Sequence, residues 1–211
     1  MEQWQPKLDL ADWRRRVAEL YAAWRSASDS GPERATRDFR AARDLLFRGH
    51  PQSPLPRDQR AGFAGVPYWD YDPAWRLTAK VDTVADDRSA QALALPTSGA
   101  EPFNFWRIGR VTLGGPFGGA QLALFWIEGY AGGLFLPFRD ATSGDSTYGA
   151  GRYLLDTSKG ADLGDDPTGE LLLDFNMAYH PSCVYDPRWN CPLAPPVNRL
   201  PLAVSVGERL A

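Results

Sequence analysis

Apolar side chains recur at three- and four-residue intervals near the start of the chain, a spacing that puts them on one face of a helix. Over residues 10–26 they are Leu10, Trp13, Val17, Leu20, Tyr21 and Trp24. Residues 34–48 carry a narrower set, Phe39, Ala42, Leu45, Leu46 and Phe47. The pattern predicts two amphipathic helices, and Asp9 or Asp12 could cap the first.

From residue 75 onward the apolar positions come in short runs separated by turn residues. These runs predict strands at residues 75–81, 91–96, 103–113, 120–128, 132–138, 151–156, 170–175 and 202–206. No long helical pattern separates them, which disfavours a parallel α/β sheet. We therefore expect a mainly β protein with α: an antiparallel β-sandwich or barrel with two N-terminal helices packed on it.

Length and composition fit one structural unit. The chain has 211 residues, of which 44% are hydrophobic and 23% charged, values typical of a globular protein. We expect an N-terminal helical pair at 1–50 and an antiparallel β domain at 75–211. Between them, residues 51–74 are dominated by proline, glycine and aromatic residues and are expected to form an irregular connector.

The charge pattern excludes some partners. The net charge is −3, and the arginines of the predicted helices alternate with acidic residues, which indicates a solvated face and no nucleic-acid partner. No apolar run is long enough to span a bilayer, and the first residues lack the apolar core of a signal peptide. We expect a cytoplasmic protein without a membrane partner. The sequence leaves its oligomeric state and any cofactor unknown.

A polar loop between two predicted strands carries the densest set of candidate binding groups. It contains Arg139, Asp140, Thr147 and Tyr148, and Arg152 follows it. The planar guanidinium of arginine suits a carboxylate or phosphate, and Asp140 could act as an acid, a base or a hydrogen-bond acceptor. The alternative is that these side chains form ion pairs and turn-stabilising bonds within a long connection.

The two cysteines leave three interpretations open. Cys183 and Cys191 lie near His180, and these three residues offer soft metal ligands, although a structural zinc site normally needs four. A local disulfide and a pair of buried thiols fit the spacing equally well.

Aromatic residues could form a pocket wall. Because neighbouring strand residues face opposite sides, Trp126 is expected to point away from Phe125. If helices or barrel closure cover that side, it could line an apolar pocket; the alternative is ordinary core packing.

Two long segments resemble a known family. LFLPFRDATSGDSTYGAGRYLLD at 134–156 and DFNMAYHPSCVYDPRWNCPLAPPVNRLP at 174–201 are similar to the bacterial and archaeal domain of unknown function 1684. The resemblance implies no activity, since none is established for the family. His180 stands where the family pattern has asparagine, and Val197 stands where it has glutamate. If those positions serve a shared site, this protein has lost or changed the activity.

Together these patterns predict a protein that binds a small-molecule ligand or substrate in an aromatic-walled pocket gated by the 139–152 loop. The candidate catalytic residues are Asp140, Tyr148 and His180, and the candidate ligand-binding residues are Arg139, Thr147, Arg152, Asp174, Asn176 and Trp126. One alternative is a pocket enzyme, either an acid–base catalyst or a cyclase acting on an apolar substrate. Another is a metal-dependent protein that uses Cys183, Cys191 and His180.

Overall fold

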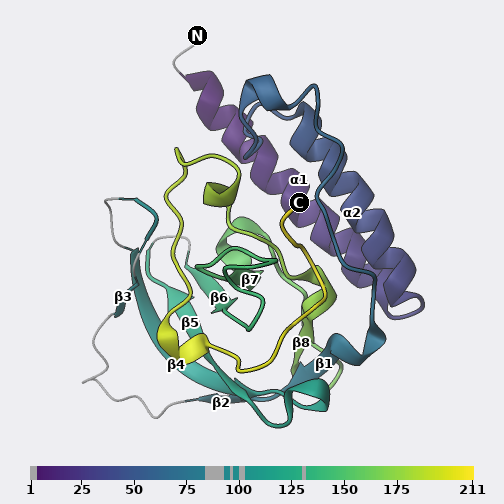
Figure 1. The fold of residues 1–211 in the computed structure, drawn as a ribbon, viewed down its shortest axis with the longest axis vertical. Coiled ribbons are helices and arrows are strands. Elements are labelled where there is room, and N and C mark those ends of the chain that lie inside the picture. The colour runs from purple at the N-terminus through teal and green to yellow at the C-terminus, as the bar shows by residue number, and fades with distance from the viewer. Residues whose placement is uncertain (1–3, 84–92, 96, 100–102, 130–131) are drawn as a thin grey trace.

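The computed structural model describes residues 4–83, 93–95, 97–99, 103–129 and 132–211 (Figure 1). Within these ranges the chain forms two N-terminal helices followed by eight strands in two antiparallel sheets. The fold is mainly β with α, as the sequence predicts. The larger sheet has two separate edges, so it is an open sandwich layer and not a closed barrel.

The two helices form a layer against the sheets (Figure 1). They are α1 (Gln5–Ser28) and α2 (Pro32–Gly49), and each has a proline in its first turn, where the missing N–H costs nothing. Because α1 begins earlier than the apolar spacing predicts, Asp9 and Asp12 lie inside it and do not cap it. Trp24 donates from Nε1 to the hydroxyl of Thr36 (3.0 Å), which joins the helices. In the described part of the chain, neither helix is apolar enough to cross a membrane.

The larger sheet has the strand order β2-β4-β5-β6-β7, with β3 also paired to β4. Its strands are β2 (Val81–Thr83), β3 (Leu93–Leu95), β4 (Phe103–Thr112), β5 (Gln121–Ile127), β6 (Gly133–Phe138) and β7 (Arg152–Asp156). All the pairings are antiparallel.

The smaller sheet pairs β1 (Arg76–Ala79) with β8 (Leu171–Asp174). The sequence predicts one strand over residues 75–81, but the structure divides that run at Lys80. The chain passes there from the smaller sheet into β2 of the larger one. The apolar pattern does not change at this point, so it could not reveal the crossing.

The prediction of a strand at residues 202–206 is wrong. This segment is irregular in the structure. Its carbonyl groups do not join a strand ladder, because those of Val204 and Val206 accept hydrogen bonds from the side chain of Arg152. The alternating apolar residues at 202–206 therefore do not form a strand; their backbone is held by the guanidinium group of Arg152.

Asn198 completes the larger sheet where its ladder is interrupted. In the register of β5 and β6, Phe125 pairs with Phe135, which places Ala123 opposite Pro137. Pro137 has no N–H to give to that pair. The Asn198 carboxamide takes its place, accepting from the N–H of Ala123 (2.8 Å) and donating to the carbonyls of Ala123 (2.9 Å) and Pro137 (2.7 Å).

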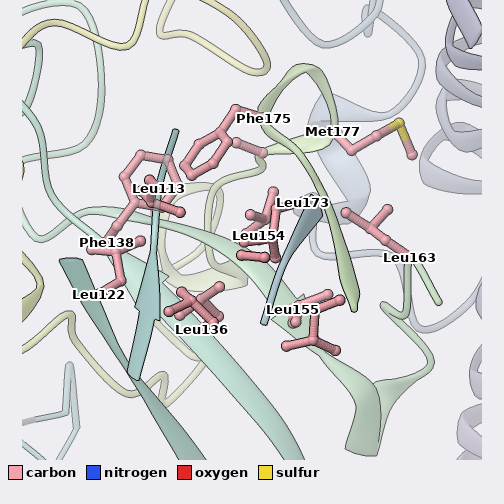
Figure 2. Close-up of a cluster of buried hydrophobic side chains, with 14 of the residues drawn as sticks. Leu113, Leu122, Leu136, Phe138, Leu154, Leu155, Leu163, Leu173, Phe175 and Met177 are labelled. Atoms are coloured by element: carbon pink, nitrogen blue, oxygen red, sulfur yellow. The ribbon is translucent and has the colours of Figure 1, made fainter. Parts of the chain in front are cut away.

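Both faces of the larger sheet are buried near its centre. The main core lies between the sheets and the helices, and Figure 2 shows its leucine, phenylalanine and methionine side chains gathered from several strands. A smaller core on the opposite face contains Leu95, Phe105, Ala123, Phe125, Phe135 and Tyr153. Trp126, near the end of β5, is 42% exposed. This double burial explains why residues 120–128 read as a nearly continuous apolar run.

The segment between the helices and the sheets is irregular apart from two short 3₁₀ turns. Leu55 and Val66 pack with Phe47 of α2 in a third apolar cluster. Trp69 then donates its backbone N–H to the carbonyl of Gly207 (3.1 Å). The connector therefore fastens the helical layer to the last residues of the described chain.

Candidate ligand site

Arg152, the first residue of β7, has a fully buried side chain that binds other parts of the protein. Its Nη2 atom donates to Oδ2 of Asp140 (2.7 Å) and to the carbonyl of Val204 (2.7 Å). Its Nη1 atom donates to the carbonyls of Val206 (2.6 Å) and Glu208 (3.1 Å). Only Nε lacks a hydrogen-bond partner. This fork joins the loop after β6 to the irregular segment that follows residue 200.

The loop that contains Asp140 is held by its own side chains. Oδ1 of Asp140 accepts from the backbone N–H and the hydroxyl of Thr142, and the hydroxyls of Thr142 and Thr147 lie 2.9 Å apart. All three side chains are buried. Such bonding of Asp and Thr to nearby backbone is typical of a rigid turn.

Asp174 and Asn176 lie in a second polar network, at the end of β8. Asp174 accepts from the backbone N–H and side chain of Asn176 (3.0 and 2.9 Å) and from Nη1 of Arg76 (3.3 Å). The Asn176 amide also bonds both backbone groups of Asp72 (2.9 Å each). Burial raises the pKa of Asp174, although the bonds from Asn176 and Arg76 oppose the shift.

Two further predicted ligand-binding residues lie elsewhere. The backbone of Arg139, directly after β6, bonds to Asn198 and Leu200 (2.9 and 2.8 Å). The exposed ring of Trp126 lies over Gly132, where an added Cβ would come within 2.7 Å of the indole. The structure thus distributes the predicted ligand-binding residues over several places.

His180 is the centre of a buried polar cluster. Its Nε2 atom accepts from the backbone N–H of Tyr148 (3.1 Å), which leaves the proton of the neutral ring on Nδ1. Nδ1 then donates to Oε1 of Glu208 (3.2 Å), and the hydroxyl of Tyr185 donates to the same oxygen. The structure therefore brings together two of the predicted catalytic residues, His180 and Tyr148, but through the Tyr148 backbone.

Glu208 is paired with a cation from the helical layer. Nη1 of Arg43 lies 3.0 Å from Oε2 of Glu208 and donates to the hydroxyl of Tyr68 (2.6 Å). The contact with Glu208 is an ion pair not aligned for a hydrogen bond. Burial by itself would raise the pKa of Glu208, but the charge of Arg43 and the bond from His180 lower it. Glu208 is therefore a carboxylate near neutral pH.

A pocket of about 90 Å³ opens next to this cluster, between the helices and the sandwich, and we call it the inter-layer pocket. Its apolar and aromatic walls come from α1 and α2, and its polar wall comes from residues 159–185. The lining residues are Trp13, Val17, Leu20, Tyr21, Phe39, Arg43, Leu46, Phe47, Pro54, Lys159, Ala161, Tyr179, His180, Ser182 and Tyr185. Among these described residues, none is an aspartate or a glutamate.

Positive and negative charges are separated at the inter-layer pocket. Lys159 lines the pocket and its Nζ lies 3.1 Å from Oδ2 of Asp156, which is buried behind it. The negative charge of Asp156 raises the pKa of Lys159. Burial raises the pKa values of Tyr21 and Tyr179, so both phenols keep their protons. The pocket surface thus presents cations and hydroxyl donors, while the carboxylates lie outside it.

Sequence reasoning did not select Arg43, Glu208, Tyr185 or Lys159. One signal was available in α2, where Arg43 stands four residues after Phe39 and four before Phe47, in the middle of the apolar face. A charge at such a position is buried and needs a partner. Nothing in the sequence identifies that partner as Glu208.

The cysteines are free thiols in the structure. No group of three or more metal-binding side chains occurs within the described residues. The geometry therefore gives no support to a metal site formed by Cys183, Cys191 and His180, because both ring nitrogens of His180 are hydrogen-bonded to Tyr148 and Glu208.

The fold and site define a helix-covered antiparallel β-sandwich with a pocket between its layers. The chain belongs to the family described as protein of unknown function (DUF1684), whose family model matches residues 61–209. It is also similar to an uncharacterized protein from gene locus rrnAC0354 of Haloarcula marismortui, solved by solution NMR. The two are 34% identical with a TM-score of 0.58, over 87% of this chain and 97% of that one. A search of curated proteins returned no match.

Proposed function

We propose that this protein binds a small molecule bearing a carboxylate in the inter-layer pocket. The observation that carries the proposal is the composition of the lining: Arg43, Lys159 and His180 with several phenols, and no acidic residue among the described residues there. A site with cations and hydrogen-bond donors on apolar walls favours an anionic group attached to an apolar body.

The volume limits the size of the ligand. A dry cavity of about 150 Å³ is large enough for benzene. The inter-layer pocket measures about 90 Å³, so it suits a short-chain carboxylate or the acidic end of a longer molecule. In this arrangement Lys159 contacts the carboxylate, and Val17 and Leu46 contact the apolar part.

The loop at residues 139–152 has an indirect role in this proposal. Its hydrogen bonds hold it in place, and the N–H of Tyr148 fixes the ring of His180 at the pocket wall. The loop would therefore position a pocket residue and not open or close over the ligand. We propose no proton transfer by His180, because its Nε2 lone pair is already used.

The test uses butyrate and butanol as matched probes, with binding followed by NMR chemical shifts of the full chain. Butyrate should perturb residues of α1, α2 and 159–185, and butanol should bind more weakly. Lys159→Gln should weaken butyrate binding about tenfold and leave butanol unchanged, because it removes the cation while its amide can still donate to the buried Asp156 carboxylate. Equal effects on both probes would contradict the proposal.

A steric variant provides an independent control. Val17→Phe adds bulk to the pocket wall without touching the polar cluster, and should abolish butyrate binding. Val197→Phe makes the same substitution at an exposed site and should bind like the unmodified protein. Binding that survives Val17→Phe would place the site elsewhere.

A further inference from the structure

Tyr21 of α1 brings to the inter-layer pocket a hydroxyl group that no described residue binds. Its side chain lines the pocket and is 4% exposed, and its ring packs against Phe39 with 4.8 Å between the centroids. A buried phenol usually has a hydrogen-bond partner. Fully buried side-chain atoms without a partner occur in the described chain at Nε of Arg40, Arg139 and Arg152 and at Oε2 of Glu208. The Tyr21 hydroxyl is not among them, so it is unbonded and still open to the pocket.

This hydroxyl lies on the side of the pocket that carries Lys159. Gly160, which follows Lys159, is so close to α1 that an added Cβ would lie 3.1 Å from the backbone nitrogen of Ala18. Ala18 is three residues before Tyr21. Because helical side chains lean back over the preceding turn, the Tyr21 ring extends toward this contact. A carboxylate held by Lys159 would therefore have the Tyr21 hydroxyl beside it.

Tyr179 offers a second unused hydroxyl. Its backbone is paired with that of Tyr153 on β7 by two hydrogen bonds (2.9 and 3.0 Å), and its side chain lines the pocket. Within the described part of the chain, its hydroxyl also has no hydrogen-bond partner. The pocket wall therefore has two free phenol donors in addition to its cations.

We propose that the ligand of the inter-layer pocket is a 2-oxo carboxylate, and that Tyr21 selects it by donating a hydrogen bond to the keto oxygen. The inference rests on the carboxylate-binding function proposed above. In such an acid the keto oxygen is directly beside the carboxylate, so a cation and a neighbouring donor suit the two groups together. A hydroxyl group in that place would bring a proton of its own, and none of the described lining residues has a carboxylate to accept it.

The experiment compares 2-oxobutyrate with butyrate by NMR titration of the full chain. The two acids have the same carbon skeleton and charge, and they differ only in a carbonyl that replaces the methylene next to the carboxylate. The 2-oxo acid should bind about fivefold to tenfold more tightly, which is the effect of one added hydrogen bond. Racemic 2-hydroxybutyrate should bind more weakly than the 2-oxo acid, because its hydroxyl proton is left without a strong acceptor. Equal binding of these two would contradict the choice of a 2-oxo acid.

Tyr21→Phe tests the role of the hydroxyl. Because this hydroxyl bonds to no described residue, its removal should leave the thermal unfolding temperature unchanged. The preference for 2-oxobutyrate over butyrate should disappear, whereas a structural defect would weaken both acids and preserve their ratio. Tyr71→Phe makes the same substitution outside the pocket, where the hydroxyl lies 3.4 Å from Oδ2 of Asp174, and should keep the preference.

The outcomes separate this inference from the proposed function. If butyrate binds in the pocket as tightly as 2-oxobutyrate, the 2-oxo acid is the wrong ligand class and carboxylate binding still stands. A preference that survives Tyr21→Phe would overturn the role of Tyr21. If neither acid binds, the proposed function is wrong and this inference fails with it.

Discussion

Arg43 of α2 and Glu208 form a buried ion pair, with 3.0 Å between Nη1 and Oε2. The two side chains are 11% and 1% exposed, so water screens neither charge strongly. The pair joins the helical layer to a segment that Arg152 ties to the sandwich. The position of the helices, and with it the shape of the inter-layer pocket, therefore depends on this contact.

Glu208→Gln should destabilise the protein by about 3 kcal/mol or more. The substitution keeps the size of the side chain but leaves the charge of Arg43 buried without a counter-ion, which is more costly than losing both charges. Urea unfolding measures the change. Glu128→Gln, at an exposed site, should change stability by less than about 0.5 kcal/mol. If the two variants were equally stable, the ion pair between Arg43 and Glu208 would not contribute to the stability of the fold.

Acid should destabilise the protein partly through Glu208. Its pKa is below the ordinary value of 4.5 in the folded state. A depressed folded pKa gives stability that is present above the unfolded value and is lost as the pH falls through the folded value. The free energy of unfolding should therefore decline below about pH 5. Glu208→Gln should show a shallower decline, and an identical pH profile would exclude this contribution.

Arg152→Lys should unfold the protein or reduce its stability by more than about 3 kcal/mol. An ammonium group cannot serve the carboxylate of Asp140 and three carbonyls in the geometry of the guanidinium fork, so buried acceptors lose their partners. Circular dichroism during thermal unfolding reports the loss. Arg107→Lys, on an exposed part of β4, is the control. A folded Arg152→Lys protein of normal stability would favour a ligand-binding role for this residue.

Asn198→Ala should cost about 3 kcal/mol, because three buried backbone groups of β5 and β6 lose their hydrogen bonds. Hydrogen exchange gives a local measurement: the amide of Ala123 should exchange much faster in the variant. Asn104→Ala, at an exposed site on β4, should leave it protected. Unchanged exchange at Ala123 would show that the strands close without the carboxamide.

The helices and most strands could be predicted because their apolar spacing reflects local geometry. The segment at residues 202–206 also alternates apolar and other residues, as a strand does. Its carbonyl groups, however, accept hydrogen bonds from the side chain of Arg152 on β7. No local sequence pattern encodes that distant contact. The division at Lys80 is similarly hidden, since both sides of it are extended and apolar. Sequence periodicity identifies extended segments but not the sheet, if any, that each one joins.

The sequence identifies the polar loop at residues 139–152, but a concentration of polar side chains does not show whether they bind a ligand or form hydrogen bonds within the protein. Asp140, Thr147 and Arg152 are all buried. Arg152 is bonded to Asp140, and the hydroxyl of Thr147 is bonded to that of Thr142, so these side chains are used within the protein. The pocket instead depends on Arg43 and Lys159, which lie far apart in the chain. Only the packing of the helices on the sandwich brings them together.

The Asn198 carboxamide has a consequence for the order in which the chain can fold. It fills the gap opposite Pro137, yet it lies 61 positions later in the sequence. During synthesis, β5 and β6 emerge well before it, and until then Ala123 has no partner across the gap. The hydrogen bonds between β5 and β6 at Ala123 and Pro137 should therefore be the last of the larger sheet to form. The final step of folding would then be the docking of the loop that carries Asn198, and not the pairing of strands.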